Sequence, residues 1–98
     1  LNGGDGNDFL QSGGGNDILN GDNNDDQIFG GTGDDTISGG TGNDFSFGDA
    51  GNDTINGDSG NDTLYGGAGA DTINGGADTD RLYGGNDNDI LNGDAGSD

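Results

Sequence analysis

The stretch GDAGNDTINGDSGND, from Gly48 to Asp62, repeats itself after nine residues. Its two halves, GDAGND and GDSGND, are separated only by Thr54-Ile55-Asn56. The register continues in both directions without insertion or deletion, so that six-residue loops begin at Gly3, Ser12, Gly21, Gly30, Gly39, Gly48, Gly57, Gly66, Gly75, Gly84 and Gly93. A fixed short period is typical of a solenoid. We therefore expect residues 1–98 to form one solenoid without an internal domain boundary.

Three positions of the nonapeptide carry most of the pattern. The first is Gly in ten of the eleven loops, the fourth is Gly in eight, and the eighth is aliphatic except at Ser46. Three residues such as Thr54-Ile55-Asn56 suit a very short strand, with Ile55 on one side and its neighbours on the other. Gly at the first and fourth positions permits positive φ. The sequence thus predicts an all-β solenoid of short strands and Gly-rich loops.

The charge of the chain limits its partners. Twenty acidic residues, all of them Asp, face the single base Arg81, which gives a net charge of −19. Such a chain attracts cations and repels nucleic acid and anionic lipid. It also has no apolar run long enough for a membrane span. We expect no nucleic-acid partner and no membrane insertion, and we expect the metal-free chain to be disordered because high charge accompanies low hydrophobicity.

The residue types present in the chain do not indicate a catalytic site. The chain has no His, Cys, Lys or Glu to act as a base or an activated nucleophile. The Asp residues recur too uniformly to form an acid and base pair with separated pKa values. We predict that the chain is not an enzyme.

The sixth position of every loop is Asp: Asp8, Asp17, Asp26, Asp35, Asp44, Asp53, Asp62, Asp71, Asp80, Asp89 and Asp98. One carboxylate per loop, together with loop carbonyls, offers an all-oxygen shell without imidazole or thiolate. Hard oxygen ligands favour Ca²⁺ over Zn²⁺ or copper, and a flexible cage favours Ca²⁺ over Mg²⁺. An EF-hand is excluded, because its bidentate Glu cannot exist here. Calcium is therefore the predicted metal.

Three of the nonapeptides, GGTGDDTIS, GGTGNDFSF and GGAGADTIN, resemble the GGxGxDxUx repeat of the RTX (repeat-in-toxin, hemolysin-type) calcium-binding proteins. The resemblance extends over the whole chain. It implies a right-handed parallel β-roll, a β-solenoid with two nonapeptides per coil, so that repeats two apart stack on each other. One edge would then stack the loops of Asp8, Asp26, Asp44, Asp62, Asp80 and Asp98, and the other those of Asp17, Asp35, Asp53, Asp71 and Asp89.

The resemblance also implies where calcium binds. Each ion would sit between stacked loops, held by the Asp of both loops and by backbone carbonyls of their first four positions. Up to about nine Ca²⁺ ions fit the gaps, and nine ions would bring +18 against the chain's −19. The carbonyl ligands belong to the loops that keep the motif best: Gly30, Gly31, Thr32, Gly33, Gly39, Gly40, Thr41, Gly42, Gly48, Asp49, Ala50, Gly51, Gly57, Asp58, Ser59, Gly60, Gly66, Gly67, Ala68 and Gly69.

Two departures from the repeat leave alternatives open. Asp22, Asp49, Asp58 and Asp94 stand at the second position, either as extra ligands or, as we expect, as solvated carboxylates. All six aromatic residues fall in alternate repeats, at outward positions of one sheet, where Phe29, Phe47, Tyr65 and Tyr83 would form one column. We expect this column to stiffen the sheet. A docking surface for the rest of a larger protein or another chain is the alternative.

The function implied by the resemblance is a Ca²⁺-dependent folding and stability element of a secreted bacterial protein. Such proteins leave the cell unfolded by type I secretion and fold outside, and we expect residues 1–98 to be part of a larger parent chain. One alternative is an extracellular surface, adhesive or ice-binding solenoid, although the irregular third loop position counts against ice binding. The other is a structural polymer that assembles end to end or with neighbouring copies.

Overall fold

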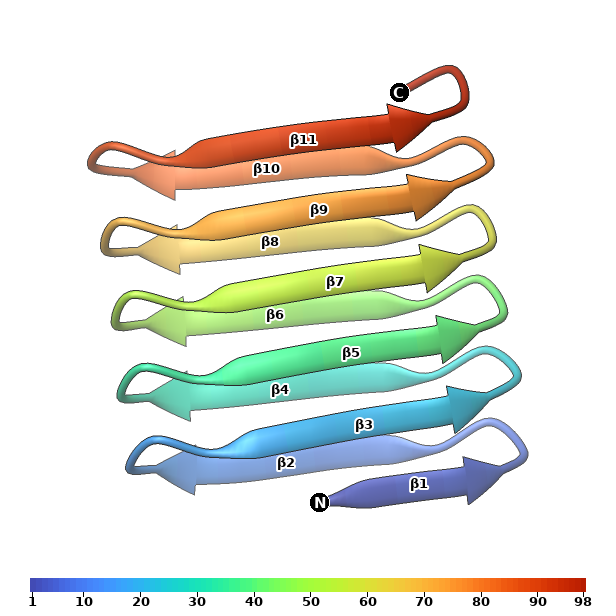
Figure 1. Ribbon diagram of the computed structural model, residues 1–98. Coiled ribbons are helices and arrows are strands. Elements are labelled where there is room, and N and C mark those ends of the chain that lie inside the picture. The colour runs from blue at the N-terminus through green and yellow to red at the C-terminus, as the bar shows by residue number, and fades with distance from the viewer.

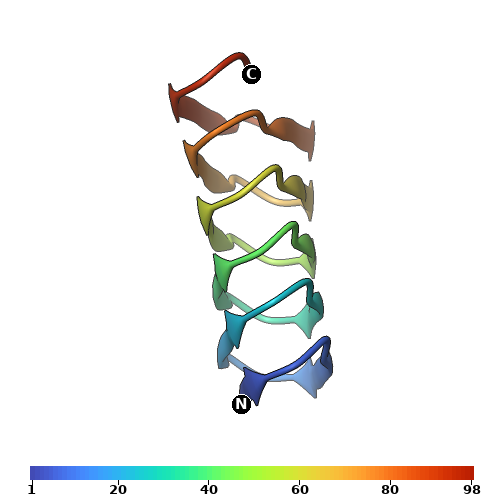
Figure 2. The ribbon, with the colours of Figure 1, turned by 90° about the vertical axis from the view of Figure 1, so that its right-hand side faces the viewer.

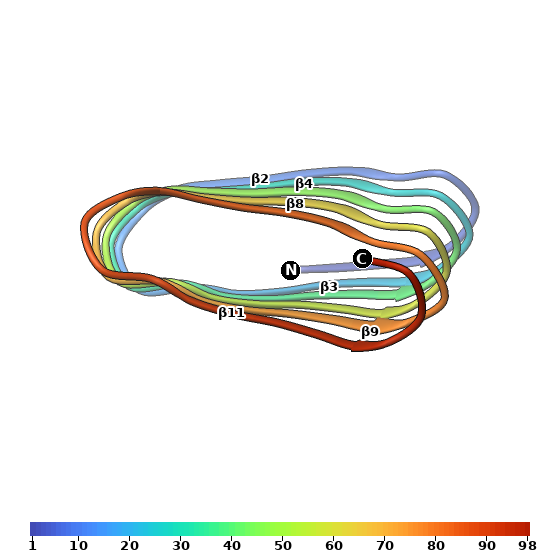
Figure 3. The ribbon, with the colours of Figure 1, turned by 90° about the horizontal axis from the view of Figure 1, so that it is seen from above.

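The computed structural model describes residues 1–98 and shows a flattened solenoid of eleven strands and no helix (Figure 1). The chain runs along the front of the molecule, turns, and returns along the back one step higher, which makes the winding right-handed (Figures 1 and 3). The body measures 27 × 27 × 12 Å. A helix long and apolar enough to cross a bilayer is not present.

Alternate strands form two parallel sheets, which lie back to back as two layers (Figure 3). Sheet A contains, in spatial order, β1 (Asn2–Asp5), β3 (Ile18–Asn23), β5 (Thr36–Thr41), β7 (Thr54–Ser59), β9 (Thr72–Ala77) and β11 (Ile90–Ala95). Sheet B contains β2 (Phe9–Gly14), β4 (Gln27–Thr32), β6 (Phe45–Ala50), β8 (Thr63–Ala68) and β10 (Arg81–Asn86).

The register of the sheets confirms two nonapeptides per coil. Ile55 of β7 lies beside Ile37 of β5 and Ile73 of β9, each two repeats away. Every strand pair follows the same rule, so identical repeat positions form straight columns along the stack (Figure 2). The predicted right-handed parallel β-roll is therefore correct.

The strands are longer than the three residues predicted. Each of β2 to β11 has six residues, because the ladder continues from the seventh, eighth and ninth positions into the first three of the next loop. Gly40 pairs with Asp58 and Thr41 pairs with Ser59, for example. Backbone groups of the Gly-rich segment thus find partners in the neighbouring coils, which leaves only three residues to turn the chain at each edge.

The core between the sheets is one side chain deep. It consists of the eighth-position residues, and Leu19, Ile28, Ile37, Ile55, Leu64 and Ile73 are completely shielded from solvent. Within each strand the first-position residue also faces inwards, as the burial alternation of β5 and β7 shows. Where this residue is Gly it leaves space, and a loop side chain fills that space.

Ser46 interrupts the aliphatic column of sheet B. It lies between Ile28 and Leu64, is completely buried, and its Oγ has no hydrogen-bond partner. A buried hydroxyl without a partner costs about 1–3 kcal/mol. Ser46 is therefore a local defect of the core.

We predict that Ser46→Val raises the free energy of unfolding of the Ca²⁺-saturated protein by about 1–2 kcal/mol, because it removes the unpartnered hydroxyl and adds apolar contact. Denaturant unfolding at constant Ca²⁺ measures this value. Ser59→Val, at an exposed position of β7, is the control and should change stability by about 0.5 kcal/mol or less. A less stable Ser46→Val protein would contradict the prediction.

Candidate metal centre

The sixth-position Asp side chains are buried inside the roll, although each one carries a charge. Seven of them are only 1–2 % exposed: Asp26, Asp35, Asp44, Asp53, Asp62, Asp71 and Asp80. They occupy the turn between two strands and fold back over the interior beside the aliphatic column. A buried carboxylate needs a compensating charge or several donors, so the surroundings of its two oxygens decide what the site can bind.

Two backbone positions turn the loop so that Asp faces inwards. Positive φ occurs at the second and the fourth position of every loop, including Asp58 (φ 75°), Asn24 (φ 79°) and Asp78 (φ 84°). Gly tolerates this conformation, and Asn and Asp tolerate it better than other residues. The prediction of positive φ is thus confirmed for the fourth position. It is wrong for the first, which still belongs to the extended strand.

The first position requires Gly for a different reason. A Cβ on Gly30 would lie 2.5 Å from Oδ2 of Asp35 in its own loop and 2.9 Å from the carbonyl oxygen of Gly48 in the next coil. The equivalent atoms surround the other interior Gly residues at this position, such as Gly57 and Gly66. The missing side chain therefore makes room for the carboxylate, and it lets a carboxylate oxygen and a carbonyl oxygen of the next coil approach the same point.

One oxygen of each carboxylate joins successive coils. The backbone N–H of Asp44 donates to Oδ1 of Asp62 at 2.8 Å, and that of Asp26 donates to Oδ1 of Asp44 at 2.8 Å. Nine such bonds run along the two edges, always between residues 18 apart. The structure thus brings the predicted Asp residues together in the two predicted columns.

The other oxygen has no protein partner. Oδ2 is buried without a hydrogen bond in eight loops, those of Asp8, Asp26, Asp35, Asp44, Asp53, Asp62, Asp71 and Asp80. Buried polar atoms are nearly always paired in proteins, so eight identical exceptions at one repeat position indicate a missing partner. A hard cation fits this donor set, because it would face an anionic oxygen and a neighbouring carbonyl oxygen.

The backbone must supply most of any metal shell, because no three acidic side chains converge at a point. The third-position carbonyls of Thr32, Ala50, Ser59 and Ala68 accept N–H bonds of 2.8–3.0 Å from the coil below. A carbonyl oxygen has a second lone pair, so these atoms keep one acceptor site. The predicted carbonyl residues are the last three residues of a strand and the first residue of the turn that follows it, as Gly30, Gly31 and Thr32 of β4 and then Gly33 show.

Comparison with known families decides what these stacked loops are. The family model of the RTX calcium-binding nonapeptide repeat matches residues 1–28, 20–55, 38–73, 47–82 and 65–98, which together span the chain. The protein belongs to the RTX calcium-binding repeat family. No curated protein and no solved structure matches it. Calcium is the metal that this family of repeats binds, as the oxygen-only donor set predicted.

The RTX loop that begins at Ser12 differs from the others. The Oγ of Ser12 donates a hydrogen bond to the carbonyl oxygen of Gly30 in the next coil. A side chain thus stands where the other loops have only a Gly hydrogen, and it occupies a carbonyl that faces the gap. Asp17 of this loop is absent from the eight residues with a buried, unpartnered Oδ2.

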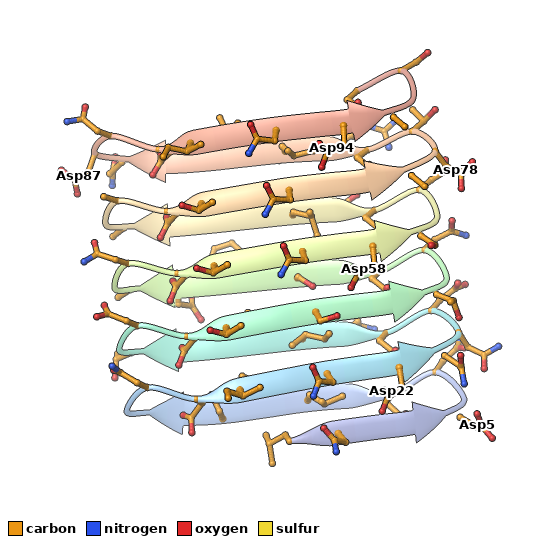
Figure 4. The ribbon with its side chains drawn as sticks, viewed as in Figure 1. Asp5, Asp22, Asp58, Asp78, Asp87 and Asp94 are labelled. Carbon is orange, nitrogen blue, oxygen red and sulfur yellow. The ribbon has the colours of Figure 1, made fainter.

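The second-position Asp residues lie apart from the buried columns. Asp22, Asp58 and Asp94 project from the outer face of sheet A in alternate coils (Figure 4). Asp58 accepts a hydrogen bond from Ser38 Oγ. Asp49 occupies the same repeat position on sheet B, where burial raises its pKa. The side chains of these four residues are therefore separate from the sixth-position carboxylates.

A second series of side-chain hydrogen bonds between RTX coils was not predicted. The fifth-position side chain accepts the N–H of the fifth residue in the next coil, as Asp25 Oδ1 does from Asn43 N at 2.8 Å. Asn7, Asn16, Asp34, Asn43, Asn52 and Asn61 make the same bond. The signal in the sequence was the presence of Asn or Asp at this position in eight of eleven loops.

Burial changes the acidity of the central carboxylates. It raises the pKa of Asp44, Asp53 and Asp62 to about 6, and the N–H bond from the preceding coil offsets only part of this rise. Neighbouring Asp carboxylates raise these pKa values further. Burial raises the pKa of Asp26 and Asp71 in the same direction. Without a cation, the folded roll therefore binds protons more tightly than the unfolded chain.

We predict that acid favours the metal-free roll. An Asp whose pKa is about 6 when folded and about 3.9 when unfolded adds stability below pH 4 that is lost as the pH rises through 6. Protein freed of metal on a chelating resin should therefore gain β signal in circular dichroism between pH 7 and pH 4. The affinity of the folded roll for Ca²⁺ should fall over the same range, because protons compete with the ion for the same oxygens.

The control is the triple variant Asp44→Asn/Asp53→Asn/Asp62→Asn, which is neutral at these positions at every pH. Its β signal without metal should depend less on pH than that of the original chain. A β signal that falls on acidification of the original chain would contradict the predicted sign.

Proposed function

We propose that this chain is a Ca²⁺-dependent folding and stability element of a secreted bacterial protein. The observation that carries the proposal is the stacking of eight Asp side chains whose buried Oδ2 atoms have no partner. A chain with a net charge of −19 cannot keep these carboxylates buried and ionised at low cost. Cation binding at the loops removes that obstacle, so metal binding and folding form one equilibrium.

The proposed ligands are the sixth-position carboxylates and loop carbonyls of successive coils. Asp62 illustrates the arrangement, because its Oδ1 contacts the coil below and its Oδ2 faces the first-position glycine of its own loop near a carbonyl of the coil above. Calcium would supply positive charge and a flexible oxygen coordination shell at each gap. Of up to about nine gaps, we propose that the one beside Ser12 binds most weakly, because the Ser12 hydroxyl occupies the Gly30 carbonyl.

We further propose type I secretion of the unfolded chain, followed by folding in the calcium-rich exterior and by attachment to the rest of a larger parent protein. Membership of the RTX family and the acidic composition support this assignment. The proposed role is structural and not catalytic, since the chain offers no His, Cys, Lys or Glu and its Asp residues serve the loops.

The first test of this proposal is the metal dependence of folding. In excess chelator at pH 7 the chain should give a disordered circular dichroism spectrum, and Ca²⁺ should produce a cooperative transition to β structure. Mg²⁺ at the same concentrations should fail to do so, because it keeps its waters and requires stricter octahedral geometry. A full β spectrum in chelator, or equal folding with Mg²⁺, would refute the proposal.

The second test compares two carboxylates of the same loop. Asp62→Asn keeps an oxygen for the N–H of Asp44 but removes the charge and the anionic Oδ2, whereas Asp58→Asn removes the same charge from the outer face. We predict that Asp62→Asn raises the Ca²⁺ midpoint of folding about tenfold, equivalent to about 1.4 kcal/mol. Asp58→Asn should leave the midpoint nearly unchanged. Equal shifts would mean that net charge alone, and not ligation, sets the midpoint.

A further inference from the structure

The outer face of sheet B is chemically unlike the rest of the molecule. All six aromatic residues project from it, and each of its five strands carries at least one: Phe9, Phe29, Phe45, Phe47, Tyr65 and Tyr83. We call this set the aromatic face. The only charged residues at the outward positions are one acid, Asp49, and the only base of the chain, Arg81, and the other polar residues there are Gln11, Gln27 and Thr63. The face is thus close to neutral on a body with a net charge of −19.

The rings form one continuous patch. Phe47 and Tyr65 have ring centroids 5.4 Å apart, and Tyr65 stacks on Tyr83 at 4.5 Å with nearly parallel planes. Phe9 and Phe45 lie at the seventh position and contact rings of the ninth-position column, at 5.3 Å from Phe29 and 5.5 Å from Tyr65 respectively. The patch is therefore wider than one column of rings. A single column would be enough to stiffen the sheet, so the extra width needs another explanation.

The rings remain accessible after they have packed together. Phe9 is 64 % exposed and Tyr83 is 46 % exposed, and the four rings between them are half-buried. Soluble monomers rarely expose a contiguous apolar patch of more than a few hundred Å² without a partner. Sheet A, built on the same backbone, shows the contrast. Its outer face carries Thr and Asn columns and the carboxylates of Asp22, Asp58 and Asp94 (Figure 4), and its exposed apolar residues Ile18 and Ile90 lie far apart on β3 and β11.

We propose that the aromatic face is the interface of a homodimer, in which a second copy of this chain covers it face to face. A broad face of the molecule measures 27 × 27 Å, or about 730 Å², which is close to the area of about 800 Å² that each partner contributes to a standard interface. Aromatic enrichment and depletion of charge are typical of the centre of such interfaces. A two-fold contact also buries the same patch on both copies.

Charge favours a second copy as the partner. A neutral aromatic surface excludes strongly charged partners, and the matching surface on another copy is neutral and aromatic as well. Calcium bound at the loops would lower the repulsion between the two bodies. Dimerisation should therefore require Ca²⁺.

The test is sedimentation equilibrium of the Ca²⁺-saturated protein over a range of concentrations. The mass should rise from 9.6 kDa towards twice that value. The variant Phe47→Thr/Tyr65→Thr should remain monomeric throughout. The matched control Asn56→Thr/Asn74→Thr changes the same repeat position on sheet A and should dimerise like the original chain. Circular dichroism verifies that each protein is folded, which separates failure of this proposal from failure of calcium-dependent folding.

A second measurement needs no variant. The chain has two tyrosines, both on the aromatic face, and no tryptophan, so its intrinsic fluorescence reports on this face alone. Quenching by acrylamide in Ca²⁺ should fall severalfold from dilute to concentrated protein. The proposal is overturned by a monomeric mass at all concentrations, by quenching that does not change, or by assembly that persists in Phe47→Thr/Tyr65→Thr. The last result would indicate end-to-end assembly of the coils instead.

Discussion

The fold depends on a carboxylate that is turned into the interior of every complete coil. Its Oδ1 accepts an N–H from the coil below, and its Oδ2 is buried without a donor, as at Asp44 and Asp53. Burying a charge without compensation costs several kcal/mol. We therefore propose that the coils stack at neutral pH only when a cation neutralises these oxygens. The interior position of the sixth-position carboxylate therefore links the stacking of the coils to the charge of the chain and to metal binding.

The same placement determines the chemistry of the other loop positions. The first residue is Gly because the carboxylate occupies the space of its Cβ, as Gly30 and Asp35 show. The second and fourth residues adopt positive φ because the chain must reverse direction in very few residues. The fifth residue carries an oxygen that binds the next coil, which complements the downward bond of the sixth. The side chains at the second, third, seventh and ninth positions remain free to vary.

The period of nine could be predicted because it is regular in the sequence. The two-repeat coil and the two Asp columns could be predicted only through the resemblance to the RTX repeats, because the period alone does not say how many repeats make a coil. The six-residue strands could not be predicted from propensity, since Gly-rich segments such as Gly39-Gly40-Thr41 resemble loops until a neighbouring coil supplies hydrogen-bond partners. The role of the first Gly depends on where the Asp35 carboxylate lies in space. The fifth-position bond joins residues 18 apart, so no local motif reveals it, although frequent Asn and Asp at that position was a signal.

The two outer faces differ although the metal loops impose the same backbone on both. On sheet A, Asn74 donates to Asn56 at 2.8 Å and accepts from Asn92 at 2.8 Å, so this column satisfies its polar groups within one molecule. On sheet B the rings pack on one another and still present apolar surface. Members of the ring column, such as Phe47 and Tyr65, are 18 residues apart in an acidic sequence and form a patch only when the coils stack. In the proposed calcium-dependent folding, neutralisation of the loop carboxylates comes first, and the unfolded chain at low calcium would have no patch through which to aggregate.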